Sequence, residues 1–66
     1  MIKEVEYAWI RGFCTALADM HRLLLHGNNS EGLREIARSA GVSLNSARRA
    51  GAAKWDVDEL VKAGIE

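Results

Sequence analysis

Four glycines divide this proline-free chain of 66 residues into segments that each show helical periodicity. Gly27, Gly41, Gly51 and Gly64 each follow a run of helix-forming residues, at the place where the left-handed conformation that ends a helix favours glycine. The spacing predicts an all-α fold: a long N-terminal helix at about 2–26, two short helices joined by a turn within 31–51, and a C-terminal helix at 56–63. A chain of this length is expected to form a single domain, residues 1–66.

The predicted N-terminal helix carries more apolar surface than one packing partner requires. One stripe recurs at the helical spacings 3, 4, 3 and 4, and it comprises Ile10, Phe13, Leu17, Met20 and Leu24. A second stripe runs beside it, and its small residues would let another helix approach closely. We predict that one stripe packs on the C-terminal half of the chain and that the other forms a homodimer or binds a partner protein. The predicted interface comprises Val5, Ala8, Trp9, Gly12, Phe13, Ala16 and Met20. The alternative is that a monomer absorbs both stripes in its own core.

The C-terminal segment carries signals for both ends of a helix. Asp56 is predicted to cap the N-terminus, with Glu59 returning the hydrogen bond three residues later as in a capping box. Trp55 and Leu60 then stand where a hydrophobic staple forms. Gly64 predicts a Schellman-like end for this helix.

Composition restricts the compartment of the protein. The single cysteine, Cys14, excludes an intrachain disulfide and is typical of a reducing compartment. The N-terminus carries Glu4 and Glu6 where a secretory signal would carry positive charge. Charged residues also interrupt the most apolar window of the chain. We therefore expect a soluble protein of the bacterial cytoplasm that does not bind membranes.

The net charge of zero hides an asymmetry along the chain. Residues 28–54 carry a net charge of +3, residues 55–66 carry −3, and residues 1–27 are balanced. The middle segment is therefore predicted to face an anion, and the tail is predicted to repel one.

Residues 33–52, LREIARSAGVSLNSARRAGA, have the spacing of two short helices held across each other by a tight turn. Ala37 falls where the helices would cross, and Gly41 falls in the turn, where a positive φ is expected. The other positions predicted to be buried are Leu33, Ile36, Ala40, Val42, Ala47 and Ala50. The positions predicted to face outward on the second helix are Ser43, Asn45, Ser46, Arg48 and Arg49.

This stretch resembles the helix-turn-helix regulators of bacteria and their phages. The resemblance implies that the second helix of a helix-turn-helix-like unit docks in the major groove of DNA, where arginine favours guanine. Arg34, Arg38 and Lys54 would contact flanking phosphates, which position a protein without reading sequence. The implied function is a small regulatory DNA-binding protein, and a homodimer would suit a palindromic site.

A looser resemblance covers most of the chain. The segments 9–13 (WIRGF), 16–18 (ALA), 40–42 (AGV) and 50–60 (AGAAKWDVDEL) are similar to small accessory proteins of Mu-like temperate phages. Some members of that broad group are helical dimers that bind and disable host proteins. This resemblance implies a phage-encoded homodimer that inhibits a host transcription regulator, pilus motor or defence complex.

The second resemblance gives the basic and aromatic residues a different partner. Arg48 and Arg49 would pair with acidic groups on the host protein, and Trp9 or Trp55 would anchor the interface, because arginine and tryptophan dominate binding hot spots. Packing in the protein's own core is the more ordinary role of each tryptophan.

Residue types that carry catalysis or bind metals lack a supporting pattern. His21 and His26 are five apart and do not share a helix face, whereas Cys14 and His21 do share one, but two ligands rarely hold a zinc ion. The acidic residues near the C-terminus lack the spacing of a calcium loop. No Ser/His/Asp constellation and no glycine-rich phosphate loop is evident. We therefore expect no enzymatic activity, no metal site, no cofactor and no small-molecule substrate.

Overall fold

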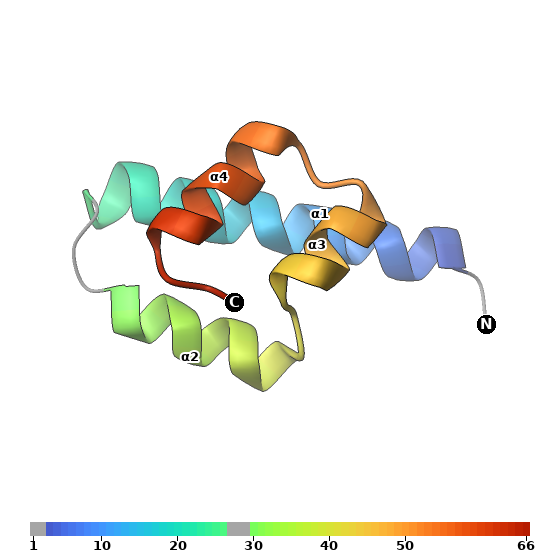
Figure 1. The fold of residues 1–66 in the computed structure, drawn as a ribbon, viewed down its shortest axis with the longest axis horizontal. Helices are drawn as coiled ribbons and strands as arrows, with labels where there is room; N and C mark the ends of the chain where they lie inside the picture. Colours follow the sequence, from blue (N-terminus) through green and yellow to red (C-terminus); the bar gives the residue numbers. More distant parts are fainter. Residues whose placement is uncertain (1–2, 27–29) are drawn as a thin grey trace.

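The computed structural model describes residues 3–26 and 30–66, and these residues form an all-helical fold (Figure 1). A long N-terminal helix, α1 (Lys3–Asp19), continues as a π-helical segment, η1 (Met20–Leu24). Three shorter helices follow: α2 (Ser30–Ala40), α3 (Leu44–Ala50) and α4 (Lys54–Lys62). The predicted all-α class and the long N-terminal helix are confirmed, and the two described ranges contain no strand. None of the helices in these ranges is long and apolar enough to cross a lipid bilayer.

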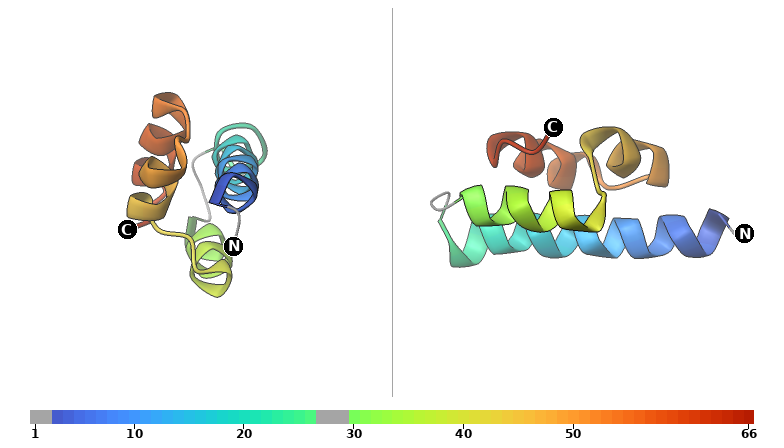
Figure 2. Two further views of the ribbon diagram at one scale, coloured as in Figure 1. Left: turned by 90° about the vertical axis from the view of Figure 1, so that its right-hand side faces the viewer. Right: turned by 90° about the horizontal axis from the view of Figure 1, so that it is seen from below.

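The spine of the molecule is the rod formed by α1 and η1. α2 runs back along this spine in the opposite direction, and α3 and α4 lie together on another side of it (Figures 1 and 2). Viewed along the spine, α1, α2 and the α3–α4 pair occupy three corners of a triangle (Figure 2, left). α1 is in close contact with both α3 and α4, and α4 also contacts η1. The side of α1 that faces away from the triangle is not covered by any other described element.

The hydrophobic core lies inside that triangle. Its largest fully buried side chains are Leu33, Leu60 and Cys14. The other core residues are Ile10, Leu17, Ala18, Ala37, Val42, Ala47, Ala50, Val57, Ala63 and Ile65. Half of these ten are alanines, which let the helices approach closely. The free energy of burial is therefore concentrated in a few larger side chains, each of which stabilises the fold by about 1.5–3 kcal/mol.

Glycines end three of the helices, as the sequence predicts. Gly41, Gly51 and Gly64 have φ angles of 73°, 86° and 83°, in the region where a side chain would be strained. In each case the amide that follows the glycine donates to the carbonyl five residues earlier, with N···O distances of 2.9–3.0 Å. This is the bond of a Schellman motif, and it ties off the last turn of each helix. Gly27, predicted to end the N-terminal helix, lies outside the described residues.

The start of α4 differs from the prediction. The helix begins at Lys54, two residues before the predicted start, and the capping box of Asp56 and Glu59 is not formed. Asp56 is buried instead, and its Oδ2 accepts a hydrogen bond from the Thr15 hydroxyl at 2.9 Å. Trp55, predicted to form the staple, is 70% exposed. A contact with α1 therefore outweighs the local capping preference of an aspartate in this sequence.

Candidate functional site

Most of the residues predicted to be buried in the α2–α3 unit are buried in the structure. The predicted buried residues that the structure buries are Leu33, Ala37, Val42, Ala47 and Ala50. Ile36 is instead 44% exposed, and Ala40 is only partly buried. The reason is that α2 meets the core along one narrow edge, which carries Leu33 and Ala37 one helical turn apart.

α3 begins with a reciprocal cap. The Ser43 hydroxyl accepts a hydrogen bond from the Ser46 amide at 3.2 Å, and the Ser46 hydroxyl accepts one from the Ser43 amide at 2.8 Å. The Ser46 hydroxyl also donates to the Ser43 carbonyl at 2.9 Å. Both serines are predicted from the sequence to face a partner, but they are partly buried and engaged in this cap. Their observed role is to fix the start of α3.

The outer surface of α3 presents three polar side chains, Asn45, Arg48 and Arg49, which we call the α3 face. All three are exposed because the buried alanines turn the opposite side of the helix to the core. They stand at positions i, i+3 and i+4, so they share one face of the helix. The other end of α3 is tied to α1, since the Arg11 guanidinium donates to the Ala50 carbonyl at 2.8 Å.

Most of the Lys and Arg side chains in the described residues make intramolecular hydrogen bonds or ion pairs. Arg11 and Arg34 donate to main-chain carbonyls, whereas Arg22, Arg38, Lys54 and Lys62 lie within ion-pair distance of carboxylates. Arg48 and Arg49 differ, because neither makes an ion pair or a side-chain hydrogen bond with any residue in 3–26 or 30–66. Lys3, at the start of α1, is the other such cation. The α3 face therefore holds two neighbouring guanidinium groups that are available to an anion.

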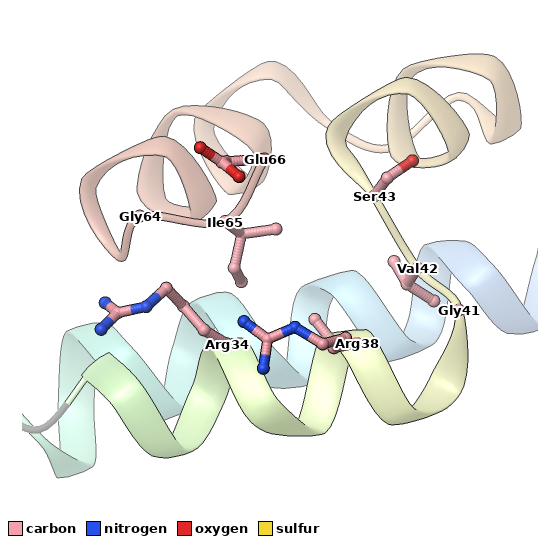
Figure 3. Close-up of a pocket in the computed structure, with 9 residues that line it drawn as sticks. Arg34, Arg38, Gly41, Val42, Ser43, Gly64, Ile65 and Glu66 are labelled. Carbon is pink, nitrogen blue, oxygen red and sulfur yellow. The ribbon is translucent and has the colours of Figure 1, made fainter.

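A cavity of about 490 Å³ lies between α2 and the C-terminal segment (Figure 3). It is lined by Arg34, Ala37, Arg38, Gly41, Val42, Ser43, Gly64, Ile65 and Glu66. Arg34 and Arg38 lie on the α2 side, and Ile65 extends from the opposite side between them (Figure 3). The Arg34 guanidinium donates to the Ala63 carbonyl at 3.1 Å, and the Leu44 amide donates to the Glu66 carbonyl at 3.0 Å. Arg34, a predicted phosphate contact, is thus occupied in holding the end of α4.

A polar cluster that was not predicted from the sequence joins η1 to α2 and α4. His21 is buried; its Nδ1 lies 2.6 Å from a Glu59 carboxylate oxygen, and its Nε2 lies 3.2 Å from the Ser30 hydroxyl. Arg22 adds contacts of 3.6 Å to Asp56 and 3.7 Å to Glu59. The two hydrogen bonds of His21 therefore connect η1 to α2 through Ser30 and to α4 through Glu59.

Two groups in or near this cluster have shifted pKa values, Glu59 and Cys14. The hydrogen bond with His21, helped by the charges of Lys62 and Arg22, lowers the pKa of Glu59 from its ordinary value of 4.5 against the opposing effect of burial. Burial, with a smaller contribution from Asp56, raises the pKa of the Cys14 thiol. Glu59 therefore stays ionised at neutral pH, whereas Cys14 stays a protonated, buried thiol.

The second apolar stripe of α1 is uncovered in this structure. Val5 and Trp9 are 64% and 47% exposed, and the Trp9 ring packs edge-on against Phe13 with their centroids 5.8 Å apart. Phe13 and Met20 are partly buried against the core. The small residues of the predicted interface that are exposed are Ala8, Gly12 and Ala16. A single copy of the fold therefore does not absorb both stripes.

Comparisons with protein-family models, with curated proteins and with solved structures find no match to this chain. Within the described ranges, no group of three or more His, Cys, Asp and Glu side chains is arranged to hold a metal ion. Function must therefore be inferred from the geometry of the surfaces described above.

Proposed function

We propose that this chain is a small, non-enzymatic regulatory protein that binds DNA by placing α3 in the major groove. The observation that carries the proposal is the α3 face, where Arg48 and Arg49 are exposed without a hydrogen-bond or ion-pair partner among residues 3–26 and 30–66, and Asn45 shares their face of the helix. Guanidinium groups pair with guanine edges and phosphates, and asparagine pairs with adenine. An α-helix is about 10–12 Å across with its side chains, and the major groove is about 12 Å wide.

Residues 55–66, the acidic tail, repel an anion at the α3 face less than their net charge suggests. Asp56 and Glu59 are engaged by Arg22 and turned toward η1, and Asp58 pairs with Lys54 at 3.1 Å. Charges that are paired within a few ångströms produce a weak field at the distance of a bound phosphate. The repulsion predicted from the sequence is therefore reduced by the way the tail folds.

Two of the predicted phosphate contacts fit this proposal better than the third. Arg38 and Lys54 are exposed and hold only surface ion pairs, with Glu35 and Asp58. Such pairs contribute about 0–1 kcal/mol, so either cation can exchange its carboxylate for a phosphate at little cost. Arg34 would first have to leave the carbonyl at the end of α4.

Fluorescence anisotropy with labelled duplexes tests the proposal. The measurement starts at low ionic strength, because the Kd of non-specific complexes at physiological salt is about 10⁻⁴–10⁻⁶ M. The test variant is Arg48→Glu with Arg49→Glu. The control is Lys3→Glu with Lys62→Glu, which makes the same change in net charge at exposed positions outside α3.

We expect the α3 variant to bind at least tenfold more weakly than the control. For this variant, the slope of log K against the logarithm of the salt concentration should also become shallower by about 2, since two phosphate-type contacts are lost. An α3 variant that binds as tightly as the wild type would overturn the proposal. Equal losses in both variants would show that net charge alone, and not α3, attracts the DNA.

A host protein is the second candidate partner, and Trp55 is the observation that favours it. This side chain is 70% exposed in the first turn of α4. A cavity of about 350 Å³ between α3 and α4, lined by Arg48, Lys54 and Val57 among others, adjoins the same turn. Tryptophan and arginine dominate interface hot spots, so the complementary surface would be an acidic patch with an apolar pocket. An inhibitor of the phage type would bind such a surface on its target.

Affinity capture from a bacterial lysate, with and without nuclease, separates the two candidates. One stoichiometric protein that resists nuclease and is lost in Trp55→Ala, but not in the matched Trp9→Ala variant, would support the protein partner. Specific DNA that is lost in the α3 variant and retained in Trp55→Ala would support DNA binding.

A further inference from the structure

The exposed apolar side of α1 continues into η1. We call it the free stripe, and it comprises Val5, Ala8, Trp9, Gly12, Ala16, Leu23 and Leu24. The two leucines are 61% and 71% exposed. Its positions repeat every three or four residues from Val5 to Ala16, and after a step of seven residues Leu23 and Leu24 continue it in η1. This spacing is the pattern of a helix that packs lengthwise on another helix.

We propose that the free stripe is the interface of an antiparallel homodimer. This inference does not depend on the proposed DNA binding, because it uses no residue of the α3 face. An antiparallel pairing can set Gly12 of each copy against Ala16 of the other. In the same register, Val5 of each copy falls against Leu23 of the other. Small residues then meet in the middle and larger ones at both ends, and a two-fold axis makes the contacts identical in the two copies.

Gly12 gives the strongest reason to place another backbone there. A glycine inside a helix destabilises it relative to alanine. A Cβ atom added at Gly12 would meet nothing within 4 Å in this structure, so packing within one copy gives no reason for a glycine. Its neighbours on the stripe, Ala8 and Ala16, are also small and exposed. A ridge of this kind is explained by a helix that approaches closely from outside.

The size of the free stripe matches a modest dimer interface. The outward half of the curved surface of a helix about 30 Å long and 10–12 Å across is roughly 500–600 Å². Two copies would bury about 1,000–1,200 Å², which is the lower limit for a specific interface. An apolar cavity of about 440 Å³, lined by Phe13, Ile36 and Ala40 among others, extends this surface toward α2. We therefore expect a reversible dimer with a Kd on the order of micromolar.

The helix dipoles favour the antiparallel direction. An antiparallel pair sets the N-terminal end of each spine beside the C-terminal end of the other, so the two dipoles oppose each other favourably. A parallel pair would bring like ends together.

Analytical ultracentrifugation over a range of protein concentrations tests the dimer. The test variant is Gly12→Gln, and the matched control is Gly32→Gln, since Gly32 is also an exposed helix residue at which an added Cβ meets nothing within 4 Å. Both changes improve helix propensity, so circular dichroism should show both variants at least as helical as the wild type. Only Gly12→Gln places a large side chain between the two spines of the proposed dimer.

We expect the wild type and Gly32→Gln to dimerise equally, and Gly12→Gln to dimerise at least tenfold more weakly. A wild type that stays monomeric up to about 1 mM, far above the expected Kd, overturns the inference. Equal dimerisation of the two glutamine variants does so as well. Arg48→Glu with Arg49→Glu should dimerise normally, so failure of DNA binding and failure of dimerisation can be told apart.

Disulfide cross-linking tests the direction of the pair. Copies with Gly12→Cys are mixed with copies carrying Ala16→Cys and then oxidised; the native Cys14 is fully buried, and the wild type serves as the uncross-linked control. The antiparallel register predicts that mixed cross-links between the two variants predominate. A parallel pair would instead cross-link each variant with itself, and that result overturns the proposed register.

Discussion

Replacing Glu59 by glutamine removes one charge from the polar cluster and leaves the size of the side chain nearly unchanged. In the native protein a Glu59 oxygen lies 2.6 Å from His21 Nδ1, and the two side chains are 13% and 4% exposed. Arg22 lies 3.7 Å from the other carboxylate oxygen. Glutamine can keep one hydrogen bond to His21, but it cannot keep the charge that strengthens the bond and that faces Arg22.

The expected loss of stability follows from that difference. Hydrogen bonds to charged groups contribute about 1.5–3 kcal/mol, and neutral ones contribute about 0.5–1.5 kcal/mol. Since both side chains are largely shielded from water, we expect Glu59→Gln to lower the free energy of unfolding by about 1–2 kcal/mol. A domain of 66 residues has a total stability of about 3–10 kcal/mol. At about 4–8 °C per kcal/mol, the variant should melt about 4–16 °C below the wild type.

The same bond predicts how this difference depends on pH. The hydrogen bond with His21 lowers the pKa of Glu59 from 4.5, so the native state favours the ionised carboxylate. The stabilisation is therefore complete above the unfolded-state value and is lost as the pH falls through the lower native pKa. Urea unfolding at a series of pH values should show the wild type and Glu59→Gln converging on the acid side.

The matched control for this experiment is Glu35→Gln. Glu35 is an exposed carboxylate that pairs with Arg38 on the surface of α2, so its loss should change the free energy of unfolding by less than about 0.5 kcal/mol at any pH. The reasoning is refuted if Glu59→Gln is as stable as the wild type at neutral pH, or if the gap between them widens as the pH falls.

Three further changes test the packing of the fold. Gly64→Ala should lower stability by about 1–2 kcal/mol in thermal melts, because φ is 83° and the new Cβ would lie 3.1 Å from the Arg34 guanidinium; no loss would mean that the end of α4 relaxes freely. Leu60→Ala should cost about 2–5 kcal/mol in urea unfolding, since this side chain is fully buried, whereas Val61→Ala, at a residue that is 51% exposed, should be nearly neutral. Cys14 should resist a thiol reagent in the native protein at neutral pH and react fully in denaturant, because burial raises its pKa; rapid labelling of the native protein would contradict the buried placement.

The parts of the fold that the sequence predicts are set by local interactions. The three glycine ends depend on residues within one helical turn, and the structure confirms them. The long N-terminal helix follows from an apolar repeat that extends over many residues. Periodicity also separates the inward side of α3 from its outward side, because Ala47 and Ala50 mark the inward one.

The contacts that could not be predicted join residues far apart in the chain. His21 meets Glu59 at a separation of 38 residues, and Arg11 meets the Ala50 carbonyl at a separation of 39. Asp56 carries a strong local signal for a cap, yet a hydroxyl on α1 binds its carboxylate instead. A local pattern states which partner a side chain can have nearby, but it contains no information about a better partner on another helix.

The sequence also does not predict which cations of the candidate site are left without an intramolecular partner. The sequence predicts Arg48 and Arg49 as the central contacts to an anion, and Arg34, Arg38 and Lys54 as flanking phosphate contacts. The structure separates them, because Arg34 is tied to a carbonyl while Arg48 and Arg49 are left without partners in the described ranges. Which cation is free depends on where every carboxylate and carbonyl falls after folding, so it follows only from the three-dimensional arrangement.

The free stripe and the α3 face lie on different sides of the spine, since α3 packs on the inner side of α1 (Figure 2). A dimer formed through the free stripe therefore leaves the α3 face of each copy exposed. Because α3 lies on the side of the spine away from the interface, a two-fold axis places the two copies of α3 on opposite outer sides of the dimer, and one short duplex contacts one copy at a time. On that reasoning Gly12→Gln, which alters no residue of α3, should leave binding unchanged both to a duplex with one half-site and to a duplex with an inverted repeat. Equal loss on both duplexes would mean that the substitution disturbs α3 itself, and a loss confined to the inverted repeat would mean that the dimer presents both copies of α3 to one duplex.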